Sequence, residues 1–139
     1  MEPPVDRRRS SIFVSFKYAF AGLWYMLRTQ RNARIHLSVA MAVVLMGLWL
    51  GVSETEWAIL VLTIGVVLTA EALNTVAEAA VDLATMEYHP LAKVAKDVAA
   101  GAVLLMAIAA VVVGFLILGP PLCRVVLGAL AVDTIAGMG

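Results

Sequence analysis

The chain is short of cysteine and of charge, and both shortages restrict what it can be. Of its 139 residues only 14% are charged, whereas 63% are hydrophobic. The mean hydropathy is +0.96. A soluble domain of this length cannot bury so much apolar surface, so a soluble fold is excluded. The single Cys123 also excludes a disulfide framework and any cysteine-based metal site.

Three long apolar runs predict three transmembrane helices, at 35–52, 57–83 and 91–119. The uncharged part of the first run is about 24 Å long, slightly short for a span, and the third has about 21 apolar residues, enough to cross. A pair of prolines at 120 and 121 predicts the end of the last helix. We therefore expect residues 120–139 to form an extracytoplasmic tail.

The segment before the first span has a different pattern. Residues 1–10 are charged and contain two prolines, so we expect a flexible N-terminus. Residues 11–30 repeat large apolar side chains at spacings of three and four, with Lys17 and Arg28 among them. This pattern predicts an amphipathic helix lying in the membrane interface.

The positive charges predict the orientation of the chain in a bacterial inner membrane. Of the ten Lys and Arg residues, only Arg124 falls on the side opposite to the other nine. Basic residues mark the cytoplasmic side of membrane proteins, so the N-terminus and the loop between the second and third spans are expected there.

A line of polar residues runs along the second span. Glu71 comes fourteen residues after Trp57, about 21 Å along the helix, which is still inside a hydrocarbon core of about 30 Å. Asn74, Glu78 and Asp82 follow at offsets of three, seven and eleven, and these spacings keep all four side chains on one helical face.

Two more polar residues, Lys96 and Asp97, begin the third span at the same expected depth. A carboxylic acid in hydrocarbon costs several kcal/mol unless it is partnered, so one reading is an ion pair of Glu71 or Glu78 with Lys96. Three acids, an amide and a Lys-Asp pair are more than such a pair requires. The set suits a phosphate-bearing ligand with a divalent cation, and a buried glutamate as a base. No P-loop and no protein-kinase signature is present.

These residues carry a family resemblance. The second span and the residues after it closely resemble the prokaryotic diacylglycerol kinase family of small membrane lipid kinases. The matching stretches are Glu71-Ala-Leu-Asn74-Thr-Val-Ala-Glu78-Ala-Ala-Val-Asp82, Glu87-Tyr88-His89 and Ala95-Lys96-Asp97. The segments Ser15–Leu23 and Arg31–His36 match as well. The resemblance covers about residues 12 to 118, and the Arg31–His36 run with His89-Pro90 looks more like the undecaprenol kinase branch.

The resemblance implies a homotrimer that uses Mg²⁺ to transfer the γ-phosphate of ATP to a lipid hydroxyl. The implied acceptor lipid is undecaprenol in preference to diacylglycerol. Glu71 would be the catalytic base, and Asn74 would order the site. The residues implied for ATP binding are Tyr18, Glu78, Asp82, Glu87, His89, Lys96 and Asp97. Taken alone, Tyr18 is an interfacial aromatic and His89 a loop histidine.

The metal site departs from the family pattern. Glu78 is the implied Mg²⁺ ligand, but the position of a second acidic ligand, before the Arg31–His36 run, is Gln30. An amide oxygen can coordinate magnesium without adding charge. Two readings of another class stay open: a non-catalytic or degenerate membrane module, and a small proton-coupled transporter that uses Glu71.

Overall fold

The structure is a computed structural model that describes residues 12–85 and 87–136, with side chains as far as Leu130. It contains four helices, α1 (Ile12–Thr29), α2 (Arg31–Leu50), α3 (Glu54–Ala84) and α4 (Pro90–Ala136), and the described residues form no strand. The last three helices are long and apolar enough to cross a membrane. The predicted all-α membrane fold is therefore confirmed, while the predicted flexible stretch 1–10 lies outside the described residues.

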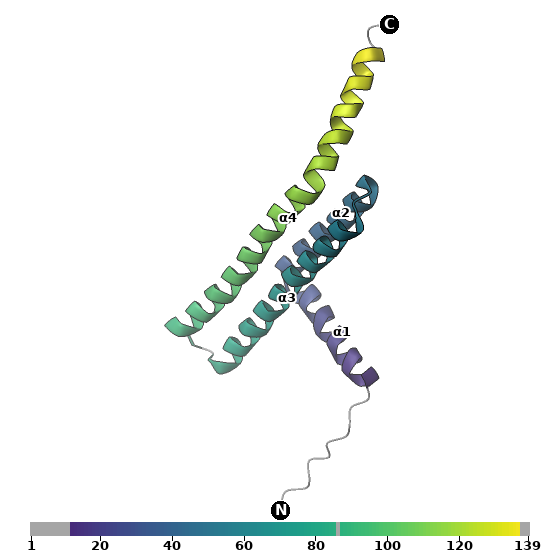
Figure 1. Cartoon of the computed structure of the whole chain (residues 1–139). Helices are drawn as coiled ribbons and strands as arrows, with labels where there is room; N and C mark the ends of the chain where they lie inside the picture. Colours follow the sequence, from purple (N-terminus) through teal and green to yellow (C-terminus); the bar gives the residue numbers. More distant parts are fainter. Residues whose placement is uncertain (1–11, 86, 137–139) are drawn as a thin grey trace, which may run out of the picture.

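The first helix diverges from the other three. Gln30 separates α1 from α2 with an extended backbone (φ −96°, ψ 118°), and its N–H ends α1 by donating to the Met26 carbonyl at 2.8 Å. Figure 1 shows α1 leaving the bundle at a steep angle. Within the described residues α1 contacts α2 and α3 but not α4. A separate N-terminal helix was predicted here, and its position in the membrane interface stays a prediction.

A tight turn with a helix cap connects α2 to α3. Gly51 ends α2 in the left-handed region (φ +65°), where a residue without Cβ is unstrained. Ser53 and Glu56 then form a capping box: the Glu56 N–H donates to Ser53 Oγ, and the Ser53 N–H donates to Glu56 Oε2 at 2.7 Å. Helix α3 therefore begins three residues before the predicted position 57. The Ser-x-x-Glu spacing of Ser53 and Glu56 is the sequence pattern that could have predicted this earlier helix start.

The core lies where the α2–α3 turn meets α4. Leu60, Ile117 and Leu118 are buried there, and Trp57 packs against them. Gly47 makes room for this indole, because a Cβ built on it would lie 3.0 Å from the Trp57 ring. The packing holds the three long helices together at one end and leaves the polar residues toward the other.

Helix α4 does not end where the sequence predicted. It continues through Pro120 and Pro121 to Ala136, so the predicted end of the helix before the prolines is wrong. The extracytoplasmic location of residues 120–139 stays a prediction. Proline lacks an N–H and crowds the preceding turn, which usually kinks or breaks the interior of a helix, but its fixed φ of about −65° is compatible with a helix and transmembrane helices tolerate it. Packing of Ile117 and Leu118 just before the prolines supports this path. In Figure 1 the far end of α4 rises well past the α2–α3 turn.

Candidate functional site

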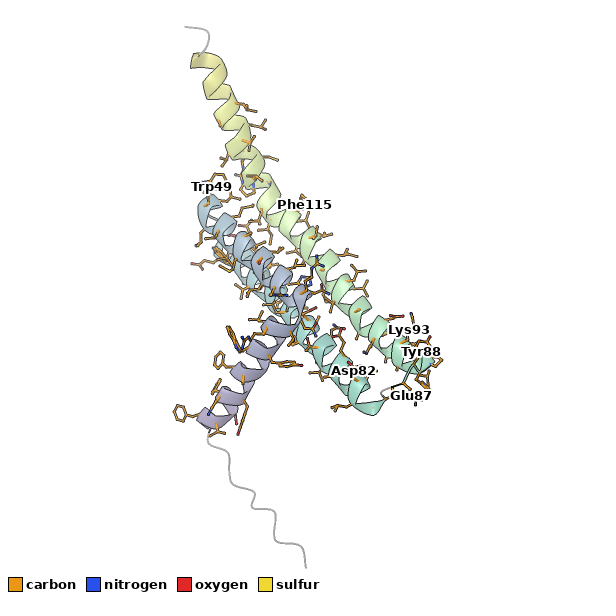
Figure 2. The ribbon with its side chains drawn as sticks, turned by 180° about the vertical axis from the view of Figure 1, so that it is seen from behind. Trp49, Asp82, Glu87, Tyr88, Lys93 and Phe115 are labelled. Carbon is orange, nitrogen blue, oxygen red and sulfur yellow. The ribbon has the colours of Figure 1, made fainter. Side chains whose placement is uncertain are left out.

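Five charged side chains lie near the connection of α3 and α4: Asp82, Glu87, Lys93, Lys96 and Asp97. Figure 2 shows Asp82, Glu87, Tyr88 and Lys93 at this end, and Trp49 and Phe115 at the opposite end. The α3–α4 connection and the first turns of α4 therefore form a polar end, whereas the apolar core of Leu60, Ile117 and Leu118 lies toward the α2–α3 turn. The predicted cytoplasmic location of this polar end stays a prediction.

Glu71 is the most deeply buried polar residue of the described part. Its exposed fraction is 1%, and its Oε2 atom has no hydrogen-bond partner. It faces the start of α2, where the fully buried Ala33 lets the two helices approach closely. The backbone of Ala33 is within hydrogen-bonding reach of the Glu71 carboxylate, and His36 is close enough to act on it electrostatically. The sequence analysis predicted neither neighbour of Glu71. The available signal was the small side chain of Ala33 in the first turn of α2, which permits close helix packing.

Glu78 is the centre of a three-residue polar cluster. Gln30 Nε2 donates to Glu78 Oε2 at 2.9 Å, and Asn74 Nδ2 donates to Glu78 Oε1 at 3.0 Å. Asn74 is itself only 5% exposed, and its Oδ1 has no partner. The predicted face of α3 therefore does bring Asn74 and Glu78 together, and Gln30 joins them from the α1–α2 break.

Two ion pairs lie further toward the polar end. Lys96 on α4 pairs with Asp82 on α3, so within the described residues it does not form the predicted alternative ion pair with Glu71 or Glu78. Lys93 pairs with Asp97 along the same helix. Lys96 therefore points to α3, whereas the Asp97 carboxylate is held against its own helix.

The remaining predicted residues lie apart from this cluster. Tyr18 is 70% exposed on α1, which makes no contact with α4 in the described chain. Glu87 is in the α3–α4 loop, where its N–H donates to Thr85 Oγ1 at 3.2 Å. His89 Nδ1 accepts the Leu91 N–H at 3.2 Å at the start of α4. One chain alone does not bring Tyr18 together with the two loop residues.

An open apolar groove runs between α3 and α4. Its volume is about 810 Å³. The α3 wall includes Leu62, Val66 and Leu73, and Met106 contributes from α4. Asn74 also lines it, so this one amide touches both the groove and the Glu78 cluster. The groove can take an apolar chain with a hydrogen-bonding group at its side.

Oxygen atoms dominate the polar cluster, but they do not form a dense acidic site. Among the described residues, no three His, Cys, Asp or Glu side chains are grouped so as to hold a metal ion. The predicted metal ligands are one carboxylate, Glu78, and one amide, Gln30. The Gln30 amide donates a hydrogen bond to the Glu78 carboxylate. Their role in holding a cation stays a prediction.

Comparison with known proteins places the chain in one family. Residues 17–118 match the prokaryotic diacylglycerol kinase family. A "Diacylglycerol kinase" of Synechocystis sp. is 50% identical over 113 residues, 81% of this chain and 65% of that protein. An "Undecaprenol kinase" of Bacillus subtilis is 46% identical over 110 residues, 79% of this chain and 89% of that protein.

A more distant relative agrees with these two. A "Diacylglycerol kinase" of Helicobacter pylori is 34% identical over 103 residues, 74% of this chain and 80% of that protein. The chain thus spans just under two thirds of the Synechocystis protein but most of the other two. The family match ends at residue 118, before the proline pair of α4.

Proposed function

This chain belongs to the prokaryotic diacylglycerol kinase family, and we propose that it transfers the γ-phosphate of ATP to the hydroxyl group of a membrane lipid. The observation that carries the proposal is the buried carboxylate of Glu71, whose Oε2 atom has no hydrogen-bond partner, on the same face of α3 as Asn74 and Glu78. A buried acid with an oxygen left without a hydrogen bond is costly, and this cost asks for a functional reason. Family membership supplies that reason.

In the proposed reaction Glu71 is the base. Its carboxylate takes the proton of the lipid hydroxyl while the hydroxyl oxygen forms a bond to the γ-phosphorus. The bond from that phosphorus to the β–γ bridging oxygen breaks, and ADP leaves with the electron pair. Phosphoryl transfer depends mainly on positioning and charge neutralisation, so a small set of side chains is sufficient. Asn74 supports this arrangement, because its amide holds Glu78 while its free Oδ1 remains an acceptor.

We propose Mg²⁺ as the cofactor, with Glu78 as its protein ligand. The side chains fit this ion in kind, since Mg²⁺ prefers oxygen ligands and the cluster offers a carboxylate and the unpartnered Oδ1 of Asn74. They supply only one carboxylate for it. When bound, the ion would neutralise charge on the phosphates. Glu78 would hold it against the nucleotide.

The nucleotide is proposed to meet the polar end of the molecule. Lys96 is a cation for the phosphates, and Asp82 orients it at a distance of 2.5 Å. Asp97, Glu87, His89 and Tyr18 complete the proposed set. Because Tyr18 lies apart from the loop residues in one chain, we propose a homotrimer in which a neighbouring copy completes the site. Mass measurement of the purified protein in detergent tests this, and a monomeric mass contradicts it.

We propose undecaprenol as the preferred lipid acceptor and diacylglycerol as the second candidate. The groove between α3 and α4 suits an apolar chain and has Asn74 in its wall. The similarity to the Bacillus subtilis protein covers 89% of that relative and favours undecaprenol. The greater identity to the Synechocystis protein, 50%, keeps diacylglycerol as the second acceptor.

Radiolabel transfer tests the proposed function directly. Purified protein is incubated with Mg²⁺ and ATP labelled at the γ-phosphate, in parallel with undecaprenol and with diacylglycerol. The expected result is labelled lipid phosphate, with more of it from undecaprenol. If neither lipid becomes labelled, the chain is not a kinase of these lipids, and the non-catalytic reading takes its place.

A further inference from the structure

Glu78 has both carboxylate oxygens engaged by neutral amides. Gln30 Nε2 binds Oε2 at 2.9 Å and Asn74 Nδ2 binds Oε1 at 3.0 Å. An uncharged amide can stabilise a carboxylate by donating N–H groups, without any cation. Each oxygen of the carboxylate that is proposed to hold a metal therefore accepts one amide N–H.

The position of Gln30 in the chain explains why its side chain reaches α3. It occupies the N-cap position of α2, where Asn, Asp, Ser or Thr would normally bond to the first helical N–H groups. The Gln30 side chain makes no such cap bond. It crosses instead to Glu78, 48 residues further along the chain. The contact is part-buried, which protects the hydrogen bond from competition by water.

Apart from Glu78 itself, the groups hydrogen-bonded in this cluster of described residues are the neutral amides of Gln30 and Asn74. On α4, Lys96 is paired with Asp82, and Asp97 is paired with Lys93. Glu71, two turns away on α3, acts on Glu78 electrostatically but is not hydrogen-bonded to it in the described chain, and it faces Ala33 and His36. Within the described residues no acidic group of three exists to attract a free divalent cation. Mg²⁺ gives up its water reluctantly and is usually held by one or two carboxylates together with substrate phosphates.

We infer that Gln30 makes divalent-cation binding at Glu78 dependent on the nucleotide. This inference rests on the proposed function. In the cation-free chain Gln30 holds the carboxylate in place as a hydrogen-bond donor. When the nucleotide supplies phosphate oxygens, Glu78 exchanges the Gln30 N–H for the cation. Asn74 keeps its bond to the other oxygen of the carboxylate.

Retention of Mn²⁺ by the full-length protein measures this directly. Equilibrium dialysis in detergent, with empty micelles as the blank, gives the Mn²⁺ bound per chain with and without a non-hydrolysable ATP analogue. We expect wild type to retain Mn²⁺ only when the analogue is present. In Gln30→Glu a second carboxylate replaces the donor, so Mn²⁺ should bind without nucleotide, at least about tenfold more tightly than to wild type.

A neighbouring substitution provides the charge control. Thr29→Glu adds the same charge one residue away on an exposed position, where the Thr29 hydroxyl donates to the Tyr25 carbonyl. It should bind Mn²⁺ as wild type does. If Thr29→Glu matches Gln30→Glu, general charge rather than the Glu78 contact is responsible, and the inference fails.

The wild-type comparison decides the matter even if the Gln30→Glu variant does not fold. Equal Mn²⁺ retention with and without the analogue, or no retention in either case, overturns the inference. Failure of the kinase proposal is distinguishable, because it would appear as absent lipid labelling while analogue-dependent Mn²⁺ retention persists.

Discussion

Lys96 at the start of α4 donates to Asp82 near the end of α3, one helical turn beyond Glu78, with 2.5 Å between Nζ and Oδ1. The pair joins two helices at the polar end, yet both side chains are substantially exposed. Exposed ion pairs contribute about 0–1 kcal/mol to the free energy of unfolding. The Lys96–Asp82 pair therefore matters mainly because it orients the Lys96 ammonium group.

Replacing Lys96 by methionine should separate binding from stability. In Lys96→Met we expect the KM for ATP to rise by about tenfold or more, because a charge-assisted contact to phosphate is lost. The free energy of unfolding should change by less than about 1 kcal/mol. Lys93→Met removes an equal charge from the same end of α4 and serves as the control. Equal KM effects in the two variants would show that Lys96 acts only through general charge.

Replacing Glu71 by its amide should remove the reaction and spare the fold. Glu71→Gln keeps the shape of the buried side chain but cannot accept the hydroxyl proton, so the rate of lipid phosphorylation should fall by about 10²–10⁴-fold. Circular dichroism in detergent should still show the wild-type helix content. Glu54→Gln, at the opposite end of α3, is the matched control. A Glu71→Gln rate close to that of the control would remove Glu71 from its role as base.

Packing near the α2–α3 turn gives a test that does not involve the site. In Gly47→Ala the new Cβ would lie 3.0 Å from the Trp57 ring, so the ring must shift. We expect a loss of about 1–3 kcal/mol in the free energy of unfolding, as for an overpacked core. Gly114→Ala, which has no heavy atom within 4 Å of its new Cβ, should be neutral or slightly stabilising. Thermal unfolding of both variants, followed by tryptophan fluorescence, compares them; equal midpoints would mean that Trp57 does not pack on Gly47.

The proposed orientation can be measured at the single cysteine. Cys123 is exposed beyond the proline pair of α4, on the side that the basic residues predict to be extracytoplasmic. A membrane-impermeant maleimide added to intact spheroplasts should label it. In a Cys123→Ser background, Glu87→Cys should be labelled only after the membrane is opened. The reverse pattern would invert the topology.

Much of the fold followed from the sequence because membrane spans are specified by local composition. The apolar runs predicted three spans, and the three- and four-residue spacings predicted both α1 and the polar face of α3. The Asn74–Glu78 contact follows from one helical turn, and is therefore readable from spacing alone. Helix positions and the contacts within one helix were therefore predictable from the periodicity of the sequence.

Contacts between helices were not predictable in the same way. The pairing of Lys96 with Asp82 rather than with Glu71 or Glu78 depends on the relative height of α3 and α4, which the loop between them sets. The donation from Gln30 to Glu78 depends on the extended backbone at Gln30 and joins residues 48 apart. The passage of α4 through Pro120 was missed because proline was read only as a stop.

The length of α4 has a practical consequence. Its 47 residues extend for about 70 Å, more than twice the hydrocarbon thickness of about 30 Å. The part from Pro121 to Ala136 alone reaches about 24 Å. A reporter protein fused behind Ala136 would therefore be carried on a rigid arm away from the α2–α3 turn and at the end opposite to Lys96. Its bulk should not obstruct access of a nucleotide to the polar end.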